Sequence, residues 1–242
     1  MPLTGNLVTR FPNGITNVAV GDIFNELPHP DPTKYHTFFD DFDKYVAADW
    51  SYSEVGAGGA ASLAGGFGGI LLLTCDAADN DYVTLQTQVA TFTCTYGKKM
   101  FFKARFKLNE VIQSDFIVGL TNFGSPQVRA TDLAVSLDGI FFLKPDGAAT
   151  VDVYYRKDNA TGSSKGTAIA TLVDDTYIVL AFYHDGVDRL YYAVDGTVTG
   201  YIDASTTFMP NADVAVTVGV QQGEITNVKT AKVDYIYVAQ ER

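Results

Sequence analysis

The sequence predicts an all-β protein built as an antiparallel β-sandwich or jelly roll. Three observations predict this fold class: apolar residues alternate with other residues in many short runs, turn signals recur at short intervals, and no internal repeat is present. We expect about twelve to fourteen short strands and almost no helix. The chain has 242 residues, of which 47% are hydrophobic, so it can bury the core of one such domain.

The clearest strand pattern lies in residues 176–203. Three apolar-rich runs are separated there by two Asp-Gly pairs, Asp185-Gly186 and Asp195-Gly196. Asp-Gly between alternating runs is typical of a β-hairpin, because glycine accepts the positive φ of a tight primed turn. We therefore expect a three-stranded antiparallel meander. Its strands are apolar on both faces, which indicates that they lie inside a sandwich or against a partner.

Residues 1–36 differ from the rest of the chain. They hold five of the eight prolines, and Pro28, Pro30 and Pro32 should keep the segment around them extended. Residues 20–27 have the pattern of a short helix capped by Asp22. A solvated tail does not need large apolar residues, yet this segment contains six: Leu3, Leu7, Phe11, Ile23, Phe24 and Leu27. We expect an N-terminal arm that makes assembly contacts with a neighbouring subunit through these six, and a disordered tail is the alternative.

The sandwich domain is expected to span residues 37–242. Strand patterns occur at 37–43, 69–75, 82–85, 91–95, 99–108, 115–122, 133–144, 150–157, 212–221 and 229–240, in addition to the meander. Residues 56–69 are rich in Gly and Ala and favour a flexible loop. Trp50, the only tryptophan, favours a place in the core or at its rim over a ligand platform.

The charge of the chain excludes one class of partner. The formal net charge is −11, so the phosphates of a nucleic acid would be repelled, and solubility is the plain interpretation of the acidity. No run approaches the roughly 20 apolar residues of a membrane span. Residues 1–14 contain no apolar core of signal-peptide length. We therefore expect neither a nucleic-acid nor a membrane partner.

The sequence predicts no metal and no cofactor. Cys75 and Cys94 are the only cysteines, and neither has a second ligand at metal-binding spacing, so we expect reduced, buried and inert thiols rather than a disulfide. The loop at 56–69 has no lysine and too few hydroxyls to cradle a phosphate. A solvated turn is favoured over a calcium site for the acidic cluster Asp76, Asp79, Asn80 and Asp81, which lacks the glycine and the distant glutamate of a calcium loop.

Two resemblances extend this interpretation. The meander with its Val194-Asp195-Gly196 turn resembles the concanavalin-like, laminin-G-like sandwich, in which two curved sheets of about six or seven strands pack face to face. Residues 1–8 (MPLTGNLV), 30–42 (PDPTKYHTFFDDF) and 139–150 (GIFFLKPDGAAT) resemble a family of tailed-bacteriophage virion structural proteins. The second resemblance implies a head decoration (cement) protein, made in the host cytoplasm and placed on the capsid surface. Its implied partners are the major capsid protein and further copies of itself, with a homotrimer expected.

The residues give no sign of a catalytic site. Glycanases with this sandwich carry a Glu-x-Asp-x-x-Glu motif, whose alternate strand positions place carboxylates on one face. The motif is absent around all five glutamates: Glu26, Glu54, Glu110, Glu224 and Glu241. The three histidines and the lack of a Gly-x-Ser-x-Gly elbow indicate no nucleophilic triad. We therefore expect no enzymatic activity and name no catalytic residue.

A carbohydrate-binding module displayed on the virion for host-surface attachment is the alternative to a decoration protein. Sugar-binding sandwiches display aromatic residues on the concave sheet, and this chain is rich in strand tyrosines. The candidates for glycan contact are Tyr155, Tyr191 and Tyr201, among a wider set with Tyr154, Tyr192, Tyr235 and Tyr237. Strand alternation sends about half of such residues into the core, so only some of them can meet a ligand.

Overall fold

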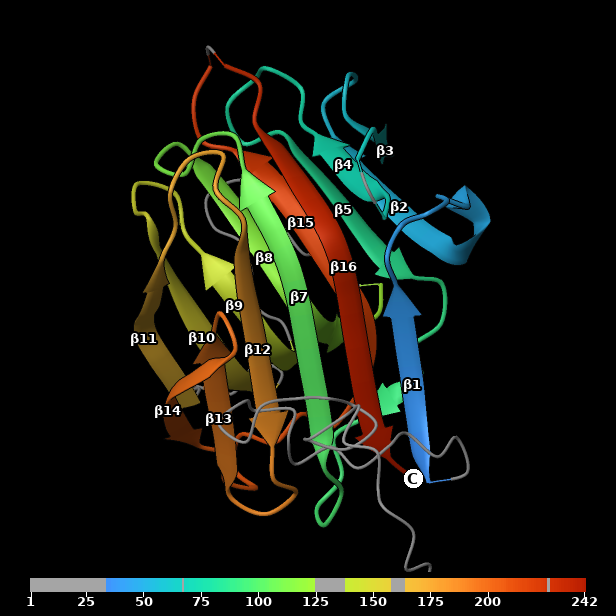
Figure 1. Cartoon of the computed structure of the whole chain (residues 1–242), viewed down its shortest axis with the longest axis vertical. Helices are drawn as coiled ribbons and strands as arrows, with labels where there is room; N and C mark the ends of the chain where they lie inside the picture. Colours follow the sequence, from blue (N-terminus) through green and yellow to red (C-terminus); the bar gives the residue numbers. More distant parts are fainter. Residues whose placement is uncertain (1–33, 67, 125–137, 158–163, 226) are drawn as a thin grey trace, which may run out of the picture.

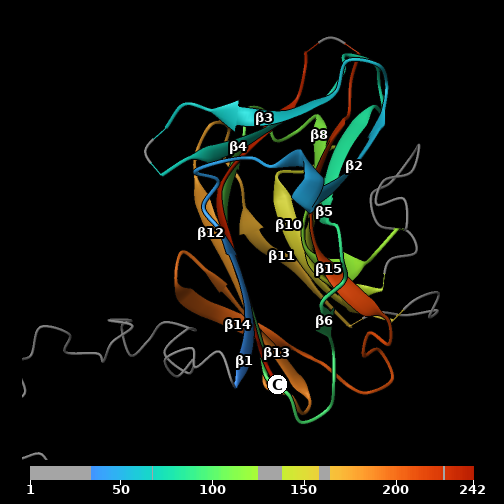
Figure 2. The same ribbon diagram turned by 90° about the vertical axis from the view of Figure 1, so that its right-hand side faces the viewer.

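The computed structural model describes residues 34–66, 68–124, 138–157, 164–225 and 227–242. These residues form two antiparallel sheets of eight strands each, which we call sheet A and sheet B (Figure 1). The sheets pack face to face as two layers, with β12 and β1 in one layer and β10 and β15 in the other (Figure 2). The predicted all-β, jelly-roll-like sandwich is confirmed. Sixteen strands in the described part exceed the expected twelve to fourteen, because short strands such as β6 (Phe92–Thr93) give little sequence signal.

Sheet A has the strand order β14-β13-β12-β7-β16-β4-β3, and β1 pairs with β16 beside this path. Along β16, residues 230–233 pair with β4, and residues 236–241 pair with β1 on the same side. The bounds are β1 (Tyr35–Asp40), β3 (Ala60–Ala64), β4 (Ile70–Thr74), β7 (Met100–Leu108), β12 (Ile178–His184), β13 (Arg189–Val194), β14 (Thr197–Asp203) and β16 (Thr230–Glu241).

Sheet B has the strand order β11-β10-β9-β8-β15-β5-β2, and β6 pairs with β15 beside this path. The bounds are β2 (Trp50–Val55), β5 (Tyr82–Thr87), β8 (Ser114–Asn122), β9 (Gly139–Lys144), β10 (Thr150–Arg156), β11 (Ser164–Thr171) and β15 (Asp213–Gln222). The only helix in the described ranges is a 3-10 turn, Ala47–Asp49. No helix there is long and apolar enough to cross a membrane.

The main hydrophobic core lies between the two sheets. Strand β7 shows how alternation builds it, because Phe102 and Phe106 point into the core with 0% exposure. Phe102 stacks on Phe182 of the neighbouring strand with 5.1 Å between ring centroids. Phe106 stacks on Phe116 at 4.4 Å and so joins sheet A to sheet B. Each fully buried phenylalanine contributes roughly 1.5–3 kcal/mol to stability.

The meander predicted over residues 176–203 is confirmed. β12 pairs with β13, and β13 pairs with β14, all antiparallel. Asp195 and Gly196 have φ of 49° and 82°, as a two-residue primed turn requires. In the first turn the Asp185 carboxylate accepts hydrogen bonds from the backbone N–H groups of residues 187, 188 and 189. The Asp-Gly pairs therefore set the register of three strands of sheet A.

The structure changes some local expectations and confirms others. The loop expected at 56–69 contains β3, whose small residues carry a weak strand signal but whose backbone pairs with β4. Trp50 is 4% exposed in the core, and Cys75 and Cys94 are both free and buried, as predicted. The expected helix at 20–27 and the first part of the strand expected at 133–144 lie outside the described residues. β1 begins at Tyr35, two residues before the expected boundary, while the assignment of 1–36 as an arm stays a prediction.

Candidate functional site

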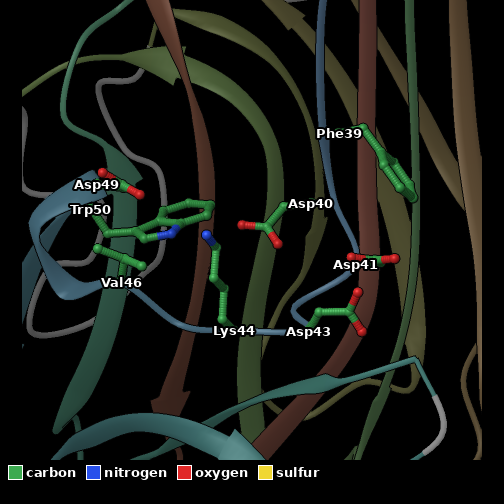
Figure 3. A pocket seen from close by; sticks show the side chains of 8 residues that line it. All are labelled: Phe39, Asp40, Asp41, Asp43, Lys44, Val46, Asp49 and Trp50. Carbon is green, nitrogen blue, oxygen red and sulfur yellow. The ribbon is translucent and has the colours of Figure 1, made fainter.

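An acidic hollow lies where the chain passes from β1 to β2 (Figure 3). Its volume is about 500 Å³. Four of its lining side chains are carboxylates, and the others are two aromatic residues, one lysine and one valine: Asp40, Asp41, Asp43, Asp49, Phe39, Trp50, Lys44 and Val46. Figure 3 shows the Lys44 side chain pointing toward Trp50 and Asp40. We call this set the acidic hollow.

Phe42 holds the acidic hollow in shape. Its backbone has a φ of +54°, and its N–H donates a hydrogen bond to the Asp40 carboxylate at 2.8 Å. Its side chain is fully buried and lies 6.1 Å from the Trp50 ring, centroid to centroid. A Cβ on Gly69 would come within 2.1 Å of the Phe42 carbonyl oxygen, so only glycine lets β4 begin this close to the loop. The acidic side chains are thus carried by a loop that the core fixes in place.

The electrostatics of the acidic hollow favour a proton or hydrogen-bond donors. Burial raises the pKa of Asp40, the Phe42 N–H partly offsets this, and the carboxylates of Asp41, Asp49 and Asp43 raise the pKa further. Across the described ranges no three His, Cys, Asp or Glu side chains are arranged to hold a metal ion. The four carboxylates of the hollow can accept hydrogen bonds from a ligand rich in hydroxyl or amino groups.

A row of stacked rings crosses the outer face of sheet A, away from the core. Phe101 of β7 stacks on Tyr183 of β12 at 4.5 Å, and Tyr183 stacks on Tyr191 of β13 at 5.9 Å. Tyr191 in turn lies 5.9 Å from Tyr201 of β14, whose ring is covered by Arg189 at 4.6 Å. Because stacked rings cover one another's faces, this row presents mainly ring edges and hydroxyl groups to its surroundings.

The tyrosines predicted for glycan contact are in two different places. Tyr191 and Tyr201 are neighbours in the row on sheet A, and Tyr201 is 52% exposed, so their role as contacts stays a prediction. The prediction that Tyr155 contacts a glycan was wrong. Tyr155 has 0% exposure between the sheets, where its ring stacks on His184 at 5.5 Å. A register shift in the pairing of β10 with β11 lies between Val151 and Val153, and Tyr155 follows these two core residues on the inner face.

The six predicted arm contacts, Leu3, Leu7, Phe11, Ile23, Phe24 and Leu27, lie outside the described residues. The acidic turn after β4 has a structural role that the sequence did not indicate. Asp76 accepts hydrogen bonds from the backbone of Ala77 and Ala57, and these hydrogen bonds lower its pKa. Asp81 is buried, so the turn is only partly solvated as expected.

Two lysines are buried although no sequence pattern indicates it. Lys144, at the end of β9, has 0% exposure and donates hydrogen bonds to the backbone oxygen and hydroxyl of Ser114. Burial lowers the pKa of Lys144 to about 8, against the opposing effect of nearby carboxylates, of which Asp115 is the strongest. Lys229 is also buried and forms salt bridges with Glu110 at 3.1 Å and Glu224 at 2.5 Å. The only sequence signal was a lysine beside an acidic turn, which is common on solvated surfaces.

Comparison with known proteins shows the fold and nothing finer. No family model and no curated protein matches the chain. An endo-1,3-beta-glucanase from Streptomyces sioyaensis superimposes with a TM-score of 0.59 and 16% identity over 88% of this chain and 98% of that one. A glycoside hydrolase family 16 endo-glucanase from Bacteroides ovatus superimposes with a TM-score of 0.58 and 13% identity, over 83% of this chain and 99% of that one. The carbohydrate recognition domain of Emp47p superimposes with a TM-score of 0.56 and 13% identity, over 87% of this chain and 98% of that one.

The exclusion of enzymatic activity was wrong as an inference from the sequence. Solved structures with this fold include two endo-glucanases and an endo-beta-1,4-glucuronan lyase from Trichoderma reesei. A missing glutamate motif does not decide the question, because one fold can carry different sites in different places. The sandwich part of the first resemblance is confirmed. The three neighbours described above are glucanases and a carbohydrate recognition domain rather than virion proteins, so the virion part stays a prediction.

Proposed function

We propose that the chain is a carbohydrate-binding β-sandwich whose acidic hollow receives the sugar. The observation that carries this proposal is the combination of four carboxylates with an exposed aromatic ring at one hollow. Phe39 is 61% exposed and lines the hollow, whereas Trp50 is 4% exposed and can only form its wall. Figure 3 shows the Phe39 ring turned away from Asp40 and Trp50, and it lies 6.2 Å from the Tyr237 ring, so a sugar would stack on it at the rim of the hollow.

The chemistry of the hollow matches a neutral or amino-substituted oligosaccharide. Sugar hydroxyl groups are hydrogen-bond donors, and ionised carboxylates are acceptors only. The apolar face of a sugar ring packs against an aromatic ring, as ligand sites generally combine apolar walls with a few placed polar groups. An anionic glycan is disfavoured, because four carboxylates face one lysine in the lining. The fold supports the proposal, since the neighbours include a carbohydrate recognition domain.

A glycan array with the full chain tests this function. We expect binding to neutral or amino oligosaccharides that Phe39→Ala weakens roughly tenfold, through the lost stacking and buried area. Asp43→Asn, which keeps the shape of the side chain, should weaken binding to the same ligands. Tyr96→Ala is the matched control, because Tyr96 is also highly exposed, at 60%, but does not line the hollow. Binding that survives Phe39→Ala unchanged, or no binding to any glycan, would count against the hollow.

The same array tests the predicted tyrosine contacts. Tyr201→Ala should weaken binding only if a glycan also contacts the row on sheet A. An effect of Tyr201→Ala without an effect of Phe39→Ala would move the proposed site from the hollow to that row.

A capsid decoration protein is a second candidate function. The observation that favours it is the resemblance of residues 1–8, 30–42 and 139–150 to phage virion structural proteins. The third of these segments contains β9, in the middle of sheet B, and the second contains β1 and the buried Phe42. In this role the chain would bind the major capsid protein, as a homotrimer. A density map of the assembled particle tests it: sandwich-shaped density on the head supports the role, and virions that lack the chain contradict it.

A further inference from the structure

A second apolar cluster lies on the outside of sheet A, separate from the core between the sheets. We call it the outer cluster, and its buried members come from five strands: Tyr35, Phe101, Ala181, Tyr183, Ala193 and Ala239. Tyr191 and Tyr237 pack against it. The outer face of an antiparallel sheet is commonly polar and solvated. The six buried members are at most 9% exposed, so this part of the outer face is covered rather than open to water.

Cations accompany the outer cluster. Strand alternation along β7 places Lys103, Arg105 and Lys107 on the same face as Phe101. Lys99 lies over the Tyr183 ring at 5.9 Å. Arg105 pairs with Asp234, and Lys107 with Asp175. Four basic residues lie on and beside one strand, and two of them are paired with carboxylates, so this face is less acidic than the chain as a whole, whose formal net charge is −11. Its occupant should accordingly be apolar and acidic.

The chain itself contains a segment with this chemistry, residues 1–33, which is followed directly by the part of the chain that enters the outer cluster. Tyr35, the first residue of β1, is a member of the cluster. The N–H of Arg242 donates a hydrogen bond to the carbonyl oxygen of Lys34 at 2.8 Å, which fixes the point where residues 1–33 join the sheet. Those residues contain one basic residue, Arg10, against three carboxylates. They also contain the six large apolar residues that the sequence analysis identified.

We propose that residues 1–33 dock on the outer cluster of their own chain. The junction at Lys34 holds the segment beside the cluster, so docking is intramolecular and has a high effective concentration. The prolines at 28, 30 and 32 limit the conformations that the segment loses on docking. Contacts with several apolar side chains act together, while the carboxylates face the lysines of β7. This inference goes beyond the proposed function, because no member of the outer cluster lines the acidic hollow.

Photo-crosslinking of the full chain tests the docking. The photoreactive residue p-benzoylphenylalanine replaces Tyr191, a partly exposed ring beside the cluster. We expect irradiation to join this position to peptides from residues 1–33, identified by mass spectrometry. The same replacement at Tyr52, a 39% exposed ring on β2 of sheet B, is the matched control and should give several-fold less of these peptides.

Isotope labelling identifies the chain that supplies the segment. When labelled and unlabelled protein are mixed before irradiation, docking within one chain gives crosslinked peptides of a single label. Mixed-label peptides would place the segment on a neighbouring copy, as an arm that contacts a neighbouring subunit would do, and would overturn the proposal. Equal yields at positions 191 and 52 would overturn it too. Lys103→Glu should lower the yield at position 191 several-fold, and an unchanged yield would contradict the predicted charge attraction.

Discussion

Lys144→Met is expected to change the pH dependence of folding stability. Lys144 is fully buried, and its pKa falls from 10.5 to about 8 in the folded protein because burial penalises the charged ammonium. Between these two pH values the unfolded chain binds a proton that the folded chain does not bind. Stability from this residue therefore rises as pH rises from 8 to 10.5. The pKa difference corresponds to about 3 kcal/mol of unfolding free energy.

Urea unfolding at several pH values between 7 and 10.5 measures this effect. Other groups titrate in the same range; burial raises the pKa of the Cys75 thiol to about 12, which makes stability fall with pH. The informative quantity is the difference in unfolding free energy between the natural chain and Lys144→Met. Methionine has a similar length and no charge, so this difference isolates the ammonium. Between pH 8 and pH 10.5 the unfolding free energy of the natural chain should rise by about 3 kcal/mol relative to that of Lys144→Met. A difference that stays constant with pH would refute the reasoning.

Two further substitutions test other buried or crowded polar groups. Asp40→Asn should raise stability at neutral pH. Burial and three nearby carboxylates raise the pKa of Asp40 in the folded chain above its ordinary value of 3.8, so the ionised carboxylate destabilises the folded chain at pH 7. Asn keeps an acceptor for the Phe42 N–H, and a loss of melting temperature at pH 7 would contradict this account. Tyr155→Phe should leave the unfolding free energy unchanged or raise it by about 1 kcal/mol, because the buried Tyr155 hydroxyl has no hydrogen-bond partner among the described residues. A marked loss in urea unfolding would show that the hydroxyl is satisfied.

The fold could be predicted because its signals are local. The Asp185-Gly186 and Asp195-Gly196 pairs determine tight turns through glycine and aspartate chemistry, and the meander follows from them. Alternation along β7 likewise identified which residues face the core. β3 was missed, because Ala and Gly residues give no apolar alternation and only pairing with β4 makes them a strand.

The candidate site could not be predicted, because it depends on contacts between distant segments. Alternation gives two faces for every strand but does not say which face is outside, so Tyr155 was placed with Tyr201 although only Tyr201 is exposed. The acidic hollow needs Phe42 to pack on Trp50 and Gly69 to pass close to Phe42. The burial of Lys144 depends on Ser114, thirty residues earlier in the chain. No spacing rule in the sequence contains these tertiary contacts.

The most direct test of the central claim is a crystal structure of the full chain with an oligosaccharide selected on the array. The proposal predicts a sugar ring packed against Phe39, with at least one hydroxyl group within hydrogen-bond distance of a carboxylate of the acidic hollow. A sugar bound on the outer face of sheet B, or only on the tyrosine row of sheet A, would contradict it.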